Sequence, residues 1–282
     1  MKRKKTGLTM IELLIVLGII ALLVGLLVPA LSTVRNMAKE TKQKAQFSTI
    51  EMALVAFKND YGDYPPSTNE LGDYCGAQKL AEALLGRDLL GFHPDSTWIA
   101  TDPTFYPPSP PGPTEDNLRQ RKGPYLELAT ANAFRLGFSA PNMRDGLFAN
   151  TGGLAWDRNV LCDVFGMKKV TIMTPITLVP RVFSAGSPIL YFKANASSKR
   201  IEPPPPLIYD LEDNRVLIML GRISDGMQHH LNTYSEFIPY IMDPKASTDV
   251  IPWPYRPDSY ILISAGVDGL YGTDDDITNF GN

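Results

Sequence analysis

The sequence has 282 residues, 44% of them hydrophobic and 20% charged, which is ordinary for a globular protein and excludes wholesale disorder. Its formal net charge of −3 excludes an overall excess of Lys and Arg, so no nucleic acid is expected as a partner. The charge is unevenly distributed. Four of the 27 basic residues lie within residues 1–7, and without them 23 Lys and Arg oppose 30 Asp and Glu, a formal charge of −7.

The chain begins with a basic segment that leads almost directly into an apolar one. Lys2 to Lys5 are all basic, and the nineteen residues from Leu13 to Leu31 contain no charged side chain. About twenty apolar residues in a helix cross the hydrocarbon core of a bilayer, so residues 8–31 are predicted to span a membrane. The positive-inside tendency keeps the basic leader in the cytoplasm and places the rest of the chain on the other side.

A cleavable secretory signal peptide and a plain signal anchor are the alternatives for this segment. A signal peptide normally has an apolar core of roughly seven to fifteen residues followed by a small-residue cleavage site. Here the small residue, Gly7, precedes the apolar run. A signal anchor gives no reason for the carboxylate of Glu12, whose insertion into a bilayer costs about 2.5–3.5 kcal/mol. A lone acid at such a place therefore indicates a function.

The residues from Gly7 to Glu12, GLTMIE, resemble the type III signal of type IV pilins and type II secretion pseudopilins. The resemblance implies that residues 1–7 are a leader, which a membrane aspartic peptidase, the prepilin peptidase, removes between Gly7 and Leu8 before it methylates the amine of Leu8. The family usually has Phe at this position, so Leu8 is a departure. The resemblance also implies that Glu12 pairs with the N-terminal amine of a neighbouring subunit, which would offset the cost of a carboxylate in the membrane. The alternative is an acid that lies in the headgroup region.

Residues 32–61 are predicted to continue the same helix as an amphipathic half. Five apolar residues recur in this half at steps of three and four: Phe47, Ile50, Leu54, Phe57 and Tyr61. This spacing places them on one helix face, which is expected to pack against the head. Gly62 and the prolines at 65 and 66 then end the helix. Residues 61–66 resemble the segment that follows the long helix in major pseudopilins of type II secretion.

Residues 62–282 are predicted to form an exported globular head. Two proline-rich segments, 101–113 and 202–206, indicate extended loops or spacers. Short strands are expected at Val170–Met173, Ile189–Lys193, Val216–Leu220 and Tyr260–Ser264. The fold class is therefore α+β, with a long N-terminal helix packed on a small antiparallel sheet. The resemblance implies a pilin-like fold, and residues 67–180 are expected to enlarge its head by insertions.

Two cysteines, Cys75 and Cys162, lie far apart in the sequence. In an oxidising compartment they could form one disulfide. The alternative is that both are small buried apolar side chains. Neither forms part of a CxxC motif, which excludes a zinc ribbon or a thioredoxin-type site.

The chain ends in a loop rich in aspartate and glycine. Four aspartates lie between Gly266 and Asp276: Asp268, Asp274, Asp275 and Asp276. Calcium binds six to eight oxygen ligands, many of them carboxylates and carbonyls of flexible loops, but the spacing does not match an EF-hand. Major pseudopilins end in such a loop, and the resemblance implies that these aspartates bind calcium and stabilise the head. The alternative is a solvated acidic turn that closes a hairpin.

No motif of a nucleophilic, phosphate-binding or metalloprotease site occurs, so we expect a structural subunit and not an enzyme. The resemblance implies a pseudopilin-like subunit of the inner membrane, with one span, a cytoplasmic leader and a periplasmic or extracellular head. Its expected partners are the prepilin peptidase, other pilin-like subunits and an inner-membrane assembly complex, and its filament would drive protein secretion. A type IV pilin or minor tip pilin for adhesion, motility or DNA uptake is one alternative. A membrane-anchored exported binding protein or hydrolase is another.

Overall fold

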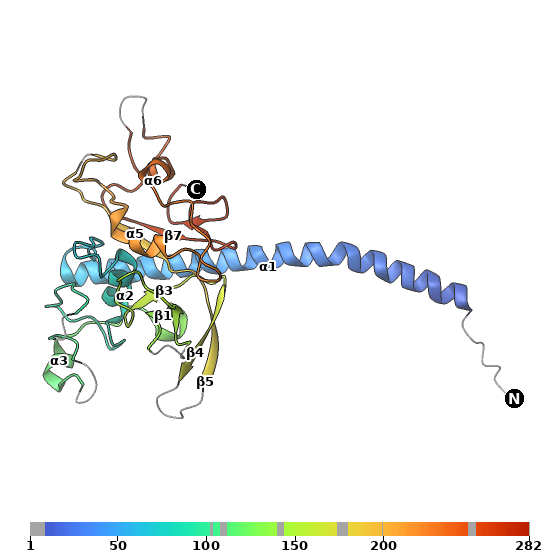
Figure 1. Cartoon of the computed structure of the whole chain (residues 1–282), viewed down its shortest axis with the longest axis horizontal. Coiled ribbons are helices and arrows are strands. Elements are labelled where there is room, and N and C mark those ends of the chain that lie inside the picture. Colours follow the sequence, from blue (N-terminus) through green and yellow to red (C-terminus); the bar gives the residue numbers. More distant parts are fainter. Residues whose placement is uncertain are drawn as a thin grey trace. The chain divides into compact units, whose positions relative to one another are not determined.

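The computed structural model describes residues 9–101, 104–107, 112–139, 144–173, 180–198, 200–247 and 252–281. The chain divides into two compact units, Met1–Thr41 and Lys42–Asn282. The first consists of the start of the long helix α1, and the second, the head, contains the remainder of that helix and all other elements (Figure 1).

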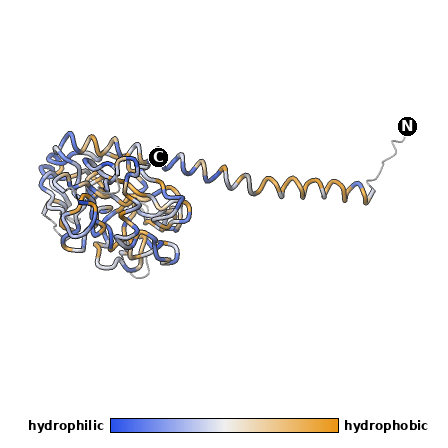
Figure 2. Tube along the Cα trace, turned by 90° about the horizontal axis from the view of Figure 1, so that it is seen from above, coloured by the Kyte–Doolittle hydropathy of each residue, from blue (hydrophilic) through white to orange (hydrophobic). Residues whose placement is uncertain are grey.

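Helix α1 runs from Met10 to Tyr61, which confirms the predicted long helix. In the first unit its apolar residues have exposed side chains, and Figure 2 shows their hydrophobic colour along this stretch. It is the one helix among the described residues that is long and apolar enough to cross a membrane. The helix ends where Gly62 takes a φ of 87° and donates its amide to the carbonyl oxygen of Lys58 at 2.7 Å.

The second half of α1 packs into the head through the predicted apolar stripe. Phe47, Ile50, Leu54 and Phe57 are each at most 3% exposed, whereas Met52 is 65% exposed. The side chain of Gln43 is also buried and accepts a 3.0 Å hydrogen bond from the amide of Val164. One face of this half is therefore core and the other is open.

The head contains five further helices among the described residues: α2 (Gly76–Leu85), α3 (Glu115–Gln120), α4 (Leu128–Ala131), α5 (Glu212–Met219) and α6 (Tyr234–Ile241). Its strands are β1 (Ala133–Gly137), β2 (Gly146–Phe148), β3 (Asn159–Leu161), β4 (Lys168–Met173), β5 (Pro180–Ala185), β6 (Leu190–Lys193), β7 (Tyr260–Ser264) and β8 (Ile277–Thr278).

These strands form three small sheets. One has the order β2-β1-β3, with β1 and β2 parallel, and one is the antiparallel pair β4-β5. The third has the order β6-β7-β8 and is antiparallel throughout. A long helix with small, mostly antiparallel sheets gives the α+β class and fits a pilin-like fold.

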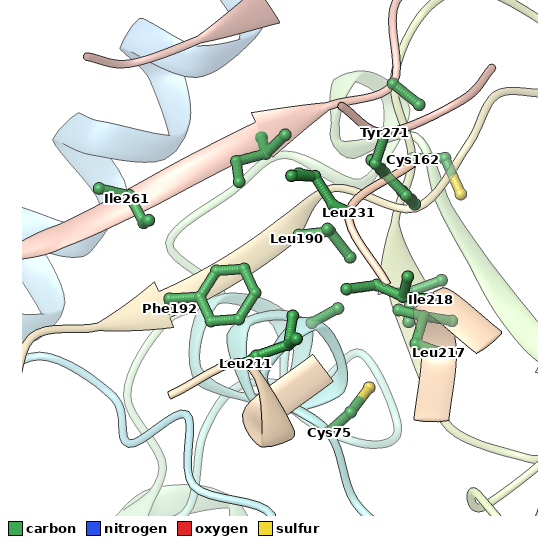
Figure 3. Packing of buried hydrophobic residues seen from close by; sticks show 14 of the residues in the cluster. Cys75, Cys162, Leu190, Phe192, Leu211, Leu217, Ile218, Leu231, Ile261 and Tyr271 are labelled. Atoms are coloured by element: carbon green, nitrogen blue, oxygen red, sulfur yellow. The ribbon is translucent and has the colours of Figure 1, made fainter. Parts of the chain in front are cut away.

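The sheet β6-β7-β8 separates two hydrophobic clusters because successive side chains of a strand point to opposite faces. Tyr191 and Leu262 join the buried face of α1 and helix α2 in one cluster. Leu190 and Ile261 join α5 and α6 in the other, part of which Figure 3 shows. The C-terminal strands therefore lie at the centre of the head.

A buried ion pair joins the start of the segment between α2 and β1 to helix α2. The Nε of Arg87 donates to Glu82 Oε2 at 2.9 Å, and both side chains are at most 2% exposed. Tyr74 and Ser96 donate their hydroxyls to the same carboxylate. The predicted proline-rich segment 101–113 falls partly outside the described residues, whereas 202–206 is described and contains neither helix nor strand.

The predicted strand at 216–220 was wrong, because these residues belong mainly to helix α5. Asp210 begins this turn: its Oδ1 accepts from the amide of Glu212 at 3.0 Å, and its carbonyl accepts from Asp213. The helix then buries Leu217 and Ile218. A short apolar run is compatible with either element, and here the acidic residues before it favoured a helix start. The other three predicted strands are present as β4, β6 and β7.

Candidate functional site

The first candidate site is the N-terminal end of α1. Glu12 Oε2 accepts hydrogen bonds from the amide of Thr9 at 2.8 Å and from its hydroxyl at 2.7 Å. The Thr9 hydroxyl in turn accepts from the amide of Glu12 at 3.3 Å, and the Thr9 carbonyl accepts from Leu13. This is a reciprocal capping box, in which each side chain satisfies a backbone donor that the helix itself leaves without a partner.

The capping box gives Glu12 a role that sequence reasoning missed. The signal was present, since Thr9 and Glu12 form the T-x-x-E spacing of a capping box ahead of an apolar run. A carboxylate here has a local structural use as well as the predicted assembly use. Gly7 and Leu8, the predicted cleavage and methylation positions, lie outside the described residues.

The second candidate site is the acidic loop, which closes the hairpin between β7 and β8. The last pair of that ladder, Ser264 with Ile277, holds the two ends of the loop together. Within the loop Asp275 organises the backbone: its Oδ2 accepts from the amides of Val267 and Asp268, and its Oδ1 accepts from the hydroxyl of Thr273 at 2.7 Å. Both oxygens of Asp275 are thus already used as acceptors.

Asp276 is partly buried and is the third aspartate of the sequence Asp274-Asp275-Asp276. Its Oδ2 accepts from the amide of Gly272 at 2.7 Å and from the hydroxyl of Tyr240 at 2.6 Å, but its Oδ1 is buried with no hydrogen-bond partner. Burial, with the nearby carboxylates of Asp275 and Asp268, raises the pKa of Asp276 to about 7. A buried carboxylate oxygen without a donor is costly and is the feature of the loop that best fits a cation.

The remaining two predicted ligands lie nearer the surface. Asp268 is partly exposed, and its Oδ1 accepts from the amide of Leu270 at 2.7 Å, while Asp274 is exposed. Among the residues that the structure describes, no three Asp, Glu, His or Cys side chains already converge as metal ligands. The loop therefore combines one unsatisfied buried oxygen, on Asp276, with neighbouring acids that point to separate partners.

Asp163 lies beneath this loop and was not singled out as a site residue from the sequence. It is fully buried; its Oδ1 accepts from the amides of Phe165 and Ser187, each at 3.1 Å, and its Oδ2 accepts from the hydroxyl of Ser264 at 3.1 Å. Burial raises its pKa to about 7, with a contribution from Asp275. Asp163 thereby links the segment after β3, through its hydrogen bond with Ser264, to the start of the acidic loop.

The two cysteines are free thiols, both fully buried in the hydrophobic cluster on the α5 side of the sheet (Figure 3). Burial raises the pKa of Cys75 to about 12, so its thiol is not activated as a nucleophile. In this structure they are small buried side chains, which is one of the two possibilities that the sequence left open, the other being a disulfide.

The prokaryotic N-terminal methylation motif matches residues 2–28, which include the basic leader, Gly7, Leu8 and Glu12. No curated protein and no solved structure matches the chain. The motif implies a prepilin-type protein, pilin or pseudopilin, that a prepilin peptidase processes and that assembles with pilin-like subunits. It points to a structural subunit and not to an enzyme.

Proposed function

We propose that this chain is a pseudopilin-like subunit that is polymerised through α1 into a short filament that drives protein secretion. The main support for this proposal is the methylation motif at residues 2–28. The motif overlaps the start of α1, which is long and apolar enough to cross a membrane and whose C-terminal half belongs to the head. In this proposal the chain crosses the inner membrane once, with its leader in the cytoplasm and its head on the periplasmic side, where an inner-membrane complex adds subunits.

Two features favour the secretion branch over a type IV pilus. The segment after α1 resembles that of major pseudopilins, and the chain closes on an acidic loop within the β7–β8 hairpin. Many type IV pilins instead close a C-terminal loop with a disulfide, whereas both cysteines here are buried outside that hairpin. The size of the head is compatible with a minor tip subunit, which is the second candidate.

In the assembly step Glu12 would exchange partners. In the single chain Thr9 satisfies the carboxylate of Glu12. After cleavage the new amine of Leu8 lies one residue before Thr9, and in a filament the amine of a neighbouring subunit would give Glu12 an opposite charge. Such a pair offsets the cost of a carboxylate in the membrane.

The substitution of Glu12 by Gln separates the two roles of this side chain. Gln serves at the third position of a capping box, so Glu12→Gln keeps the helix start but removes the charge. We expect the variant to be processed to a methylated Leu8, as intact mass and N-terminal peptide mapping of membrane-extracted protein would show. We also expect it to lose more than about ten-fold of the crosslinked self-assembly between tagged and untagged copies, which corresponds to roughly 1.4 kcal/mol.

The control is Glu115→Gln, because Glu115 is an exposed residue of α3. It should assemble as the natural chain does. Normal assembly of Glu12→Gln together with failure of Glu12→Ala would assign Glu12 to the cap alone and remove the proposed charge pair. A chain that still begins at Met1, or that is cut beyond Leu31, would contradict the proposed prepilin processing and favour an anchored or secreted binding protein.

We further propose that the acidic loop binds calcium, with Asp276 as its central ligand and with Asp268 and Asp274 beside it. The buried, unpartnered Oδ1 of Asp276 supports this assignment. Asp275 is assigned to the loop backbone, since both of its oxygens already accept hydrogen bonds. A bound calcium ion would neutralise repulsion among these carboxylates and stabilise the hairpin.

The calcium assignment predicts a ligand-dependent melting temperature for the full chain in detergent. At a calcium concentration of about 100 times Kd the expected stabilisation is about 2.7 kcal/mol, or roughly 5–10 °C in Tm relative to EGTA. The Asp276→Asn variant should lose most of this difference in Tm. Asp116 is an exposed residue of α3, and the Asp116→Asn variant should retain the difference. Identical melting in calcium and in EGTA would refute the site.

A further inference from the structure

A cavity of about 540 Å³ opens on the head away from the acidic loop. Its walls come from five places in the chain: the segment after α1, the end of β6, the second proline-rich segment, the start of α5 and the residues just before β7. This volume lies in the range of protein pockets that bind small ligands or single side chains of a partner. None of the residues that form it has a role in the proposed filament function.

The charged side chains of the cavity are mostly acidic. Four aspartates line it: Asp63, Asp210, Asp213 and Asp258. Among the described lining residues the one cation is Lys193, and its ammonium is already paired with Asp63. Beyond that pair, three further carboxyl groups line the cavity: those of Asp210 and Asp258, and that of Asp213, whose pKa burial raises to about 7.

Asp213 is the buried member of this group. It is 6% exposed, and its Oδ2 accepts the hydroxyl proton of Ser67. Its Oδ1 accepts no hydrogen bond from any residue within the described ranges. The charge of Lys79 acts on Asp213, but its ammonium donates its hydrogen bond to the carbonyl oxygen of Thr68. A carboxyl group held at this depth with an acceptor to spare is a place where a cationic donor would gain a partner.

Part of the remaining wall is apolar, and this part favours some kinds of cation over others. The apolar part of the lining includes Tyr64, Pro66, Pro205 and Pro206. A ligand with a hydrocarbon stem and a charged end matches such a wall better than a hydrated ion does.

We propose that this cavity binds an alkylammonium or alkylguanidinium group, supplied by a Lys or Arg side chain of a partner polypeptide. The guanidinium or ammonium lies among the carboxyl groups of Asp213, Asp210 and Asp258, and the stem lies against the prolines. The head thereby has a docking point for a basic residue that is separate from α1. Binding in this cavity does not require filament formation. The outcome of the binding experiment and that of the self-assembly experiment are therefore independent.

The test is calorimetric titration of the full chain in neutral detergent with blocked arginine, blocked lysine and blocked citrulline. Citrulline has the shape of arginine without its charge. We expect arginine to bind saturably with a Kd of about 1 mM or tighter, and citrulline to bind at least about ten-fold more weakly. Raising the salt from about 0.1 M to 1 M should weaken arginine binding several-fold, since the Debye length falls from about 10 Å to 3 Å.

Variants locate the binding in this cavity. Asp258 is exposed, and its side chain forms no hydrogen bond or ion pair with another residue in the described ranges. Asp258→Asn should therefore weaken arginine binding about three-fold without altering the fold. Ala196→Trp, at an exposed lining position, should abolish binding, and Asp95→Asn, outside the cavity, should change nothing. Equal binding of arginine and citrulline, or arginine binding that Ala196→Trp leaves intact, would overturn the proposal. Putrescine binding with no binding of blocked arginine or lysine would overturn the assignment to a polypeptide side chain.

Discussion

At the residue scale, Asp163 is a carboxyl group that is fully buried in the head. Three neutral groups donate hydrogen bonds to it, and no cation among the described residues forms an ion pair with it. Burial therefore outweighs the hydrogen bonds and raises its pKa to about 7. Its folded-state pKa lies above the value of about 3.9 in an unfolded chain. The stabilising effect is complete below pH 4 and is lost as the pH rises toward 7, because the folded state holds the proton more tightly.

The substitution Asp163→Asn tests this assignment. The amide oxygen of Asn can accept from Phe165 and Ser187, and its NH₂ can donate to Ser264, so the hydrogen bonds persist without a charge to bury. We expect the free energy of unfolding at pH 8 to be unchanged or to rise by about 1–2 kcal/mol, and its decline between pH 4 and pH 7 to become shallower. Urea unfolding at several pH values would measure both. A loss of more than about 2 kcal/mol at pH 8 would mean that Asp163 is stabilising as an anion.

At the element scale, α1 is one continuous helix with two kinds of surface. From Lys42 onward its buried stripe faces α2 and the sheet β6-β7-β8, and its opposite side remains open. Local sequence patterns predicted the length of α1 and the position of its apolar tract. The partners of the stripe, such as Leu262 and Tyr191, come from more than 120 residues later in the chain and could not be read from its periodicity.

Leu54 and Met52 provide a matched pair on this helix. Leu54 is fully buried and Met52 is 65% exposed, although they lie two residues apart. Leu54→Ala should reduce the free energy of unfolding by about 2–5 kcal/mol, through lost burial and the cavity left behind. Met52→Ala should change it by less than about 0.5 kcal/mol. Denaturant unfolding in detergent measures both, and similar losses for the two variants would contradict the packing of α1 described above.

At the scale of the whole molecule, the chain consists of an apolar helical unit and a head that folds around its own two clusters. All three tryptophans belong to the head, so their fluorescence reports on that unit alone. The apolar side chains of the first unit contribute nothing to either cluster. They stay available for lipid or for other subunits.

This division predicts that a substitution in the first unit leaves the stability of the head unchanged. Leu23 is 53% exposed and belongs to neither hydrophobic cluster. Leu23→Ala should therefore shift the unfolding free energy, followed by tryptophan fluorescence in detergent, by less than about 0.5 kcal/mol. A loss of the size expected for Leu54→Ala would show that the two units unfold together.

The sequence by itself determined the features that depend on neighbouring residues: the basic residues 2–5, the apolar tract that follows them, the helix stop at Gly62 and the loop of aspartates. Each of these features depends only on residues that lie close together in the sequence. Only the tertiary structure decided what distant segments do for one another. The apolar run at 216–220 became helix α5, Asp275 and Asp276 took different roles within one loop, and Asp163 was buried beneath it. These outcomes depend on packing and desolvation between segments far apart in the sequence, which no local pattern records.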